Sequence, residues 1–289
     1  MDEFVSDAWQ SAAAFARRAG VEVRMLDSLE EFDAAIGLLD QVWGNGAELL
    51  HPNLMTALRH TGNYLAGAFA GDADDPVPGF DPVPGLDPDV PGLDPGRPHE
   101  QTQHPTERMV GFCFGFRSVD ESALHSHFAA VTADKLGRSI GSALKFHQRA
   151  WCLERGIDII EWTYDPLVAR NAVFNLIKLG ADAESYLVDF YGAVDDEINR
   201  GEPSDRLMAR WHLSSPKVVD AGRGVRAGVD PQAWVKWVEV PPDIENLRVT
   251  NPELASEWRL RVREELAGPM AEGARILGFD PARGYALED

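Results

Sequence analysis

The sequence has little cysteine, no long apolar segment and an N-terminus without basic residues. Only Cys113 and Cys152 carry thiols among its 289 residues, and both lie in apolar surroundings. We expect buried free thiols in a reducing cytoplasm, with a disulfide between them as the alternative. No apolar run approaches the ~18–20 residues of a membrane-spanning helix. The acidic start MDEFVSD lacks the basic-then-apolar layout of a signal peptide. These absences predict a cytoplasmic protein that does not associate with membranes.

Charge and metal-ligand spacing exclude two further classes of partner. The net charge of −20 would repel the phosphates of nucleic acid, so we expect no nucleic-acid partner. The eight histidines and two cysteines show no ligand spacing, so we expect no metal site. With 26% charged and 44% hydrophobic residues, the chain has the composition of a globular enzyme with a sizeable core.

The most informative segment runs from Val131 to Gly156. It reads as a strand end, a loop with glycines and an amphipathic helix whose apolar residues recur at helical spacing from Ile140 onward. A loop of this kind directs backbone N–H groups at an anion, and the helix dipole adds partial positive charge. No Gly-Lys-Ser/Thr of a Walker loop is present, and Gly137 and Gly141 are wrongly spaced for a dinucleotide-binding fingerprint. The loop can therefore be interpreted as a pyrophosphate-binding site or as an ordinary turn.

Basic residues favour the pyrophosphate site. Lys135, Arg138, Lys145 and Arg149 lie in a region with few acids, within a strongly acidic chain. We expect all four to cluster around the loop, where they would attract an anion.

The order of elements around this loop resembles that of the GNAT superfamily of acyl-CoA N-acyltransferases. In that family the loop pattern Val-x-x-x-x-Arg/Gln-x-x-Gly-x-Gly/Ala wraps the pyrophosphate of coenzyme A. Counting from Val131, its last three defined positions fall on Leu136, Ser139 and Gly141, so only one of these three agrees. A register shifted to Arg138-x-x-Gly141-x-Ala143 matches the letters but breaks the spacing from Val131. We prefer the first register.

Downstream segments extend the resemblance over roughly residues 21–215. Ala172, Lys178 and Gly180 fall on family positions of the helix after the fifth strand, whereas Leu176 replaces a tyrosine that commonly protonates the departing thiolate. Residues 124–131, 165–180 and 189–192 resemble a bacterial subfamily of predicted acetyltransferases.

The resemblance implies an acyl-CoA site and a mechanism of direct transfer in a ternary complex. Backbone N–H groups of a distorted fourth strand would polarise the thioester carbonyl. Asn171 and Asn175 would bond the pantetheine arm or fill a polar surface. The predicted acyl-CoA-binding residues are Ala129, Val131, Leu136, Gly137, Arg138, Ser139, Ile140, Gly141, Ser142, Asn171, Asn175 and Lys178.

Three residues are candidates for the base that takes the proton of the attacking amine. His127 comes first, because alternation places it on one strand face with His125, Ala129 and Val131. The alternative for His127 is a packing role. The other two candidates are carboxylates, Glu161 on the neighbouring strand and Asp165 at its end. The alternative for Asp165 is to cap the following helix.

The chain divides into three parts, the second of which contains an insert. We expect an N-terminal helical extension at 1–20, a GNAT-like domain at 21–215 and an insert at 72–107 that repeats VPG[F/L]DP. Dense proline forbids helix and sheet in the insert, so it forms a surface loop. Residues 216–289 form a small β-α-β-β addition, in which Leu254, Trp258, Val262 and Leu266 point inward. This addition shapes the acceptor cleft or forms a homodimer interface.

Within this division the strands and helices have expected bounds. The predicted fold is α/β, with a mixed, mostly antiparallel sheet flanked by helices. Helices are expected at 29–43, 52–60, 166–178 and over about twenty residues from Asn251. Strands are expected at 21–26, 64–70, 109–117, 126–131, 157–164, 186–191, 207–213, 234–240, 274–279 and 284–287.

The sequence therefore predicts an N-acetyltransferase that uses acetyl-CoA, or another small acyl-CoA, to acylate a small amine. A succinyl-CoA-dependent amino-acid N-succinyltransferase is one alternative. A non-catalytic acyl-CoA-binding or sensing protein on the same fold is another, because Leu136, Ser139 and Leu176 replace residues that active members usually keep.

Overall fold

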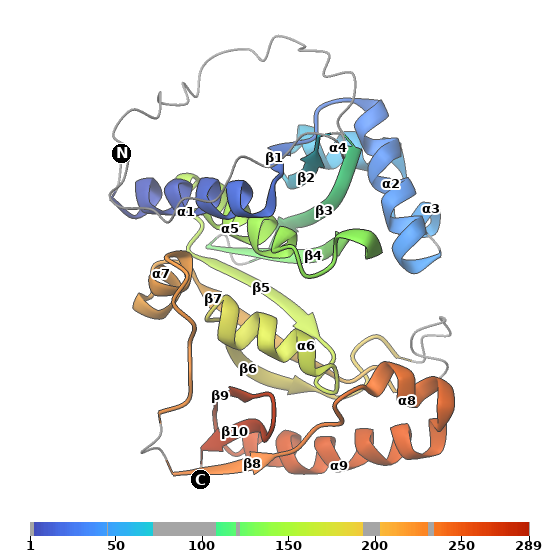
Figure 1. The fold of residues 1–289 in the computed structure, drawn as a ribbon, viewed down its shortest axis with the longest axis vertical. Helices are drawn as coiled ribbons and strands as arrows, with labels where there is room; N and C mark the ends of the chain where they lie inside the picture. Colours follow the sequence, from blue (N-terminus) through green and yellow to red (C-terminus); the bar gives the residue numbers. More distant parts are fainter. Residues whose placement is uncertain are drawn as a thin grey trace.

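The chain builds one large sheet and, beyond it, a smaller one (Figure 1). The predicted insert at 72–107 lies outside the residues that this computed structural model describes. Those residues are 3–44, 46–71, 108–119, 122–192, 203–230 and 234–288.

The large sheet has seven strands in the order β1-β2-β3-β4-β5-β7-β6. All neighbours run antiparallel except β4 and β5, which are parallel. The predicted α/β class with a mixed, mostly antiparallel sheet is confirmed. The strands are β1 (Glu22–Met25), β2 (Tyr64–Ala70), β3 (Arg108–Arg117), β4 (Ala123–Val131), β5 (Ile159–Tyr164), β6 (Asp182–Leu187) and β7 (Arg206–His212).

Helices cover both faces of the half-sheet β1 to β4. One face carries α2 (Leu29–Trp43), α3 (Gly46–Leu49) and α4 (Pro52–His60), and the other carries α5 (Ile140–Glu154) beneath α1 (Glu3–Ala19). The face with α2 and α4 is called the α2 face below, and the opposite one the α5 face. Each face has its own apolar core.

Local sequence signals explain where α2 begins and ends. Ser28 and Glu31 form a capping box at its start, because each side chain accepts from the other residue's backbone N–H. Gly44 ends the helix in the left-handed conformation, with φ of 79°. The helices predicted at 29–43 and 52–60 and the strand predicted at 64–70 are confirmed with the same bounds.

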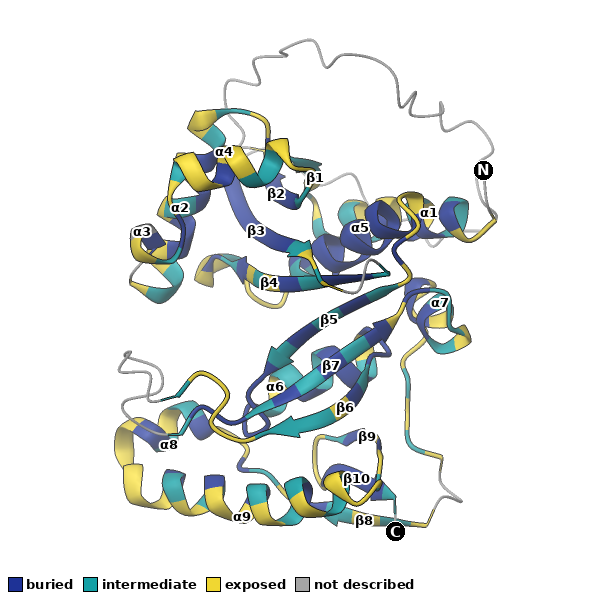
Figure 2. Ribbon diagram, turned by 180° about the vertical axis from the view of Figure 1, so that it is seen from behind, coloured by how far each residue is buried: buried dark blue, intermediate teal, exposed yellow. Residues whose placement is uncertain are grey.

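The N-terminal helix α1 is part of the core. Phe15 stacks on Phe146 of α5 with ring centroids 4.4 Å apart, and Trp9 meets the ring of His147 edge-on at 5.2 Å. Figure 2 shows the result: α5 is buried along almost its whole length between α1 and the sheet.

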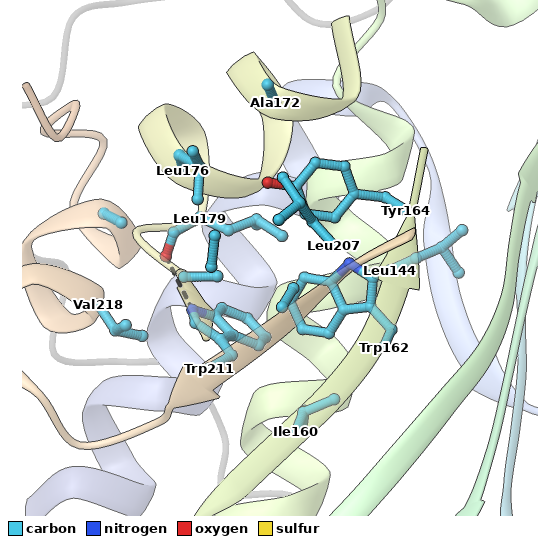
Figure 3. Close-up of a cluster of buried hydrophobic side chains, with 14 of the residues drawn as sticks. Leu144, Ile160, Trp162, Tyr164, Ala172, Leu176, Leu179, Leu207, Trp211 and Val218 are labelled. Atoms are coloured by element: carbon cyan, nitrogen blue, oxygen red, sulfur yellow. Dashed lines mark hydrogen bonds between the residues drawn. The ribbon is translucent and has the colours of Figure 1, made fainter. Parts of the chain in front are cut away.

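The segment after β5 differs from its prediction. Instead of one helix at 166–178, the chain forms α6 (Ala169–Ala172) followed by a π-helical segment, η2 (Val173–Lys178). This segment covers the α5 face of β5 and β7, where Trp211 donates a hydrogen bond to the Leu179 carbonyl (Figure 3). The strand predicted at 186–191 is also wrong in its bounds. β6 begins at Asp182, because Gly180 makes the turn at once and Ala183 is already buried.

The C-terminal addition follows the predicted β-α-β-β order with two further helices. Its sheet has the order β8-β10-β9. The elements are α7 (Pro216–Gly222), β8 (Val235–Val238), α8 (Ile244–Thr250), α9 (Pro252–Ala271), β9 (Ile276–Asp280) and β10 (Gly284–Glu288).

The buried face of α9 differs from the prediction. Leu254 is exposed, and the buried residues are Ala255, Arg259, Val262 and Leu266. Arg259 is 1% exposed, because it forms a bidentate ion pair with Asp165 at the end of β5. The addition is therefore joined to the large sheet through a buried ion pair.

Candidate active site

Strands β4 and β5 separate soon after they begin, which opens the sheet between its two halves. They pair at only three positions, the last of which is His125 with Glu161. Beyond it β4 continues to Val131 and β5 to Tyr164 as diverging strands (Figure 1). This wedge has its apex after His125 and Glu161 and opens toward the loop that follows β4.

Backbone groups of β4 face the wedge. Thr132 N–H donates to the Val110 carbonyl of β3, so in an antiparallel pair the alternate residues direct their N–H groups away from β3. Ala129 and Val131 are these alternate residues, and their N–H groups lie on the side from which β5 has diverged. Two predicted acyl-CoA-binding residues thus offer hydrogen-bond donors to the wedge.

A β-bulge changes the side-chain order of β4. Phe114 pairs with Phe128 and Gly115 with Ser126, so His127 is the extra residue. A Cβ on Gly115 would lie 2.9 Å from the His125 carbonyl oxygen, and glycine permits this close approach.

The bulge corrects the predicted grouping of side chains on β4. His127 and Phe128 both face the α2 core, with ring centroids 4.2 Å apart, whereas Val131 packs on the α5 face. His125, His127, Ala129 and Val131 therefore do not share one face as predicted, because the extra residue reverses the alternation.

His127 lies on the α2 face near the apex of the wedge and is exposed. Its ring lies 5.8 Å from that of His125 and 5.7 Å from that of Phe116, centroid to centroid. Burial, and then neighbouring His125, lowers the pKa of His127 below its usual value. The imidazole is therefore neutral at pH 7 and able to accept a proton.

The loop after β4 presents free backbone donors. A short 3-10 turn, η1 (Ala133–Lys135), precedes two left-handed residues, Gly137 with φ of 82° and Ser139 with φ of 65°. The first hydrogen bond of α5 runs from Ala143 N–H to the Ser139 carbonyl at 3.0 Å. Among the described residues, no acceptor meets the preceding N–H groups of Ile140, Gly141 and Ser142. Such a helix start is suited to phosphate oxygens.

Only two of the four expected basic residues lie at the loop. Lys135 and Arg138 are there, and neither has a carboxylate partner within the described part of the chain. Lys145 and Arg149 are 3% and 0% exposed, so their predicted position at the loop is wrong. Arg149 is turned toward α1 and α7, where it meets Asp7 and the Leu213 carbonyl. Helical periodicity carries both side chains to buried faces of α5.

The remaining predicted acyl-CoA-binding residues differ in exposure. Leu136 is 67% exposed, and Lys178 is also exposed at the end of η2. Asn171 is half-buried on α6. Asn175 is 3% exposed and accepts a hydrogen bond from Trp162 at 3.2 Å, so its side chain serves the core.

Asp165 is occupied by partners. Arg259 donates to both of its carboxylate oxygens at 2.8 Å, Arg248 donates at 2.5 Å, and Leu167 N–H donates at 2.9 Å. Burial alone would raise the pKa of Asp165, but the two guanidinium groups hold it well below its usual range. The predicted cap is not formed, because α6 begins at Ala169 with Val168 as its N-cap and no side-chain bond there; the Asp165 carboxylate instead binds the two guanidinium groups.

Glu161 lies on the α2 face of β5, because Ile160 and Trp162 on either side of it enter the opposite core. It pairs across the strands with His125 and with Arg210 of β7, whose guanidinium lies 4.0 Å from its carboxylate. Farther along β7, Arg206 lies over the exposed ring of Tyr191 at 5.2 Å. The α2 face beside the wedge thus carries titratable and charged groups.

Sequence reasoning expected Lys145 at the loop and missed its position at the apex of the wedge. Lys145 reaches from α5 to Ser126 Oγ of β4 at 2.9 Å, and its Nζ lies 3.8 Å from the ring centroid of Trp162 on β5. Gln148 Oε1 accepts a further bond at 2.9 Å. A lysine at an apolar position of an amphipathic helix is the signal that could have located it.

The described residues also bear on the expectations for thiols, metal sites and membrane-spanning helices. Both cysteines are free and buried, as expected. Within the described ranges, no cluster of His, Cys, Asp and Glu is suited to a metal ion. None of the helices described is both long enough and apolar enough to span a bilayer.

Comparison with known proteins finds that this chain is similar to solved structures in its fold. No protein-family model matches the sequence, and no curated protein is significantly similar to it. The solved structures that match include acetyltransferases, and one of them is a putative acetyltransferase of the GNAT family from Desulfovibrio desulfuricans, which is 14% identical with a TM-score of 0.46 over 67% of this chain and 99% of that one. The ribosomal-protein-S18-alanine N-acetyltransferase of Escherichia coli is 12% identical, with a TM-score of 0.42, and the match covers 68% of this chain and 95% of that one.

Two further structures cover a similar share of the chain. An N-acetyltransferase from Staphylococcus aureus Mu50 is 10% identical, with a TM-score of 0.46, over 67% of this chain and 99% of that one. An aminoglycoside 6'-N-acetyltransferase complexed with coenzyme A is 12% identical, with a TM-score of 0.42, over 67% and 98%.

Proposed function

We propose that this protein is an N-acyltransferase that moves an acetyl or other small acyl group from acyl-CoA to the amine of a small molecule. The observation that carries the proposal is the wedge between β4 and β5, which opens beside the free N–H groups at the start of α5. An extended donor with a phosphate at one end and a thioester at the other matches this pairing of two diverging strands with an anion site.

The loop would hold the pyrophosphate. Ile140, Gly141 and Ser142 supply backbone donors, while Lys135 and Arg138 supply full positive charge. Ser139 stands where the family pattern has glycine, and its left-handed φ of 65° explains why glycine is favoured there. The local positive charge offsets the repulsion that a chain of net charge −20 would exert on coenzyme A.

The wedge would hold the pantetheine arm and the thioester. The N–H groups of Ala129 and Val131 lie along it, and such donors polarise a carbonyl whose oxygen gains negative charge during attack. Transfer is then direct, within a ternary complex.

The acceptor amine would approach from the α2 face. His127 is exposed there with a neutral imidazole, and Glu161 lies on the neighbouring strand. We propose His127 as the base and Glu161 as its nearest alternative. Residues 21–215 would form the catalytic domain, and the C-terminal addition would shape the acceptor cleft. Two buried reduced thiols suit a reducing cytoplasm.

The loop proposal predicts that Gly141→Glu abolishes acyl-CoA binding in a folded protein. Gly141→Ala is the matched control, because a Cβ there would lie 3.5 Å from Phe174, an ordinary contact. The glutamate adds bulk and negative charge where phosphate would sit, whereas alanine leaves the N–H group accessible. Gly268→Glu, at an exposed position of α9, controls for the added charge. Titration calorimetry with acetyl-CoA measures binding, and equal affinity in Gly141→Glu and in the parent would refute the site.

The same preparation separates an enzyme from a binding protein. Release of free thiol from acetyl-CoA and succinyl-CoA is followed with a panel of amino acids, small amines and aminoglycosides. Turnover with any amine supports the transferase. Tight binding of acyl-CoA without turnover across the panel supports the sensing alternative.

A further inference from the structure

A buried ammonium group lies at the apex of the wedge. Lys145 is 3% exposed, and its Nζ contacts Ser126 of β4 and the ring of Trp162 on β5. These two residues come directly after His125 and Glu161, the last pair of the parallel ladder. The ammonium therefore bridges the two strands at the first position where they no longer bond to each other.

The surroundings of Lys145 contain no counter-ion. No carboxylate of the described residues forms an ion pair with it, and its contacts are a hydroxyl, an amide oxygen and an aromatic ring. Burying an ammonium without an acidic partner is costly, and packing at this site would be served as well by an apolar side chain. Such a group calls for a functional explanation.

Lys145 is the main source of charge at the apex of the wedge, because the neighbouring titratable groups are neutral. Cys113 of β3 and Cys152 of α5 face it, and burial raises the pKa of both thiols, so they are neutral. His125 of β4 has its pKa lowered by burial and by Lys145, so it is neutral as well. Burial lowers the pKa of Lys145 itself to about 8. The ammonium is thus charged at pH 7 but far more acidic than a surface lysine.

We propose that Lys145 is a catalytic acid that protonates the sulfur of the departing coenzyme A. The inference rests on the proposed function. A donor that enters the wedge from its open end, with its phosphates at the loop, brings its thioester toward the apex, and the group at the apex is Lys145.

The proton balance of the step is simple. When the amine has added to the thioester carbonyl, the C–S bond breaks and its electron pair remains on sulfur. The Nζ–H bond of Lys145 supplies the proton that makes the free thiol and leaves a neutral amine, which regains a proton from solvent before the next turnover. The proton of the attacking amine leaves separately, to His127 or another base.

The first test observes the side chain directly and needs no variant to fold. The chain has five lysines, Lys135, Lys145, Lys178, Lys217 and Lys236, so a ¹³C-lysine NMR spectrum is simple to assign. We expect one signal, that of Lys145, to titrate near pH 8, well below the usual range of a lysine side chain. Coenzyme A should raise the pKa of that signal through its thiolate, whereas desulfo-coenzyme A, which lacks the sulfur, should not. Equal responses to the two ligands, or no response, would overturn the proposal.

The second test uses Lys145→Met, which removes the acid and keeps the volume. We expect kcat to fall by roughly 10² or more, with acetyl-CoA affinity changed by less than about threefold. The alkaline decline of kcat near pH 8 should disappear in the variant, because only the charged ammonium can donate. Lys236→Met, on exposed β8, is the matched control. A parent-like kcat with the same alkaline decline in Lys145→Met would overturn the proposal.

Failure of the proposed function would look different. If the parent binds acetyl-CoA but acylates no amine, the transferase proposal fails, and the comparison of coenzyme A with its desulfo analogue still decides whether Lys145 meets the sulfur. If calorimetry detects no coenzyme A binding, both proposals fail together.

Discussion

At the scale of single residues, the bulge in β4 determines which side chains can meet a substrate. One extra residue places His127 beside Phe128 on the α2 face and leaves the N–H groups of Ala129 and Val131 toward the wedge. The proposed base and the proposed carbonyl-polarising donors would therefore act on one thioester from different directions. Without the bulge, simple alternation would turn His127 and Val131 to the same side.

His127 can be tested through the pH dependence of the reaction. Burial and His125 lower its pKa, so the base is neutral and active above that pKa and becomes protonated as the pH falls through it, below about 6.5. We expect His127→Gln to reduce kcat by roughly 10²–10⁴-fold with little change in acyl-CoA affinity, and to remove the acidic decline. His60→Gln, on exposed α4, is the control. A rate and an acidic decline like those of the parent would exclude His127 and leave Glu161 or a water chain.

At the scale of elements, sequence patterns located most strands and helices but not their irregularities. The capping box and terminal glycine of α2 are local, and local signals were sufficient for it. The bulge at His127, the π-helical turn after α6 and the divergence of β5 from β4 depend on contacts between distant segments. These irregularities build the wedge, so the sequence predicted the loop and the fold class better than the side chains at its apex.

The same distinction applies to charged residues. Lys145, Arg149 and Arg259 look like surface groups in the sequence, yet each is nearly fully buried. Their partners are a hydroxyl on β4, a carbonyl after β7 and a carboxylate after β5, all far away along the chain. The neighbouring residues do not indicate such partners, so these contacts could not be predicted locally; Lys145 alone carries a local signal, its apolar position on an amphipathic helix.

The buried ion pairs of Asp165, which join the end of β5 to α8 and α9, lead to a prediction about stability. Asp165→Asn should destabilise the protein by about 3–5 kcal/mol at neutral pH, because it breaks the buried ion pairs of Asp165 with Arg248 and Arg259. Asp182→Asn is the control, since its ion pair with Lys217 is exposed and worth under about 1 kcal/mol. Urea unfolding measures both.

The pH dependence of stability provides a second test of Asp165. The folded-state pKa of Asp165 is lowered, so its contribution is present above the unfolded value near 4 and is lost as the pH falls below it. The stability difference between parent and Asp165→Asn should therefore shrink in strong acid. A difference below 1 kcal/mol at neutral pH would contradict the structural role and reopen Asp165 as a candidate base.

At the scale of the whole molecule, additions at both ends of the chain are bound to the large sheet. The N-terminal helix buries α5 through Trp9 and Phe15, and α9 reaches the end of β5 through Arg259. Both attachments lie against elements that border the wedge. The additions thus hold α5 and β5 in place on the two sides of the proposed acyl-CoA site.

The insert contrasts with these additions, and the ends that flank it show why. Strands β2 and β3 pair up to Ala70 with Arg108, so the two chain ends that border residues 72–107 are adjacent in the sheet. A short connection can close such an antiparallel pair without moving it. We predict that replacing residues 74–104 with a short Gly/Ser linker leaves the melting temperature and coenzyme A affinity nearly unchanged, since the segment has few apolar residues at regular spacing. Deletion of α1, which uncovers the buried rings of α5, is the contrasting variant and should prevent stable folding. Scanning calorimetry and acetyl-CoA titration test both, and a large loss of stability in the linker variant would show that the insert packs as an integral element.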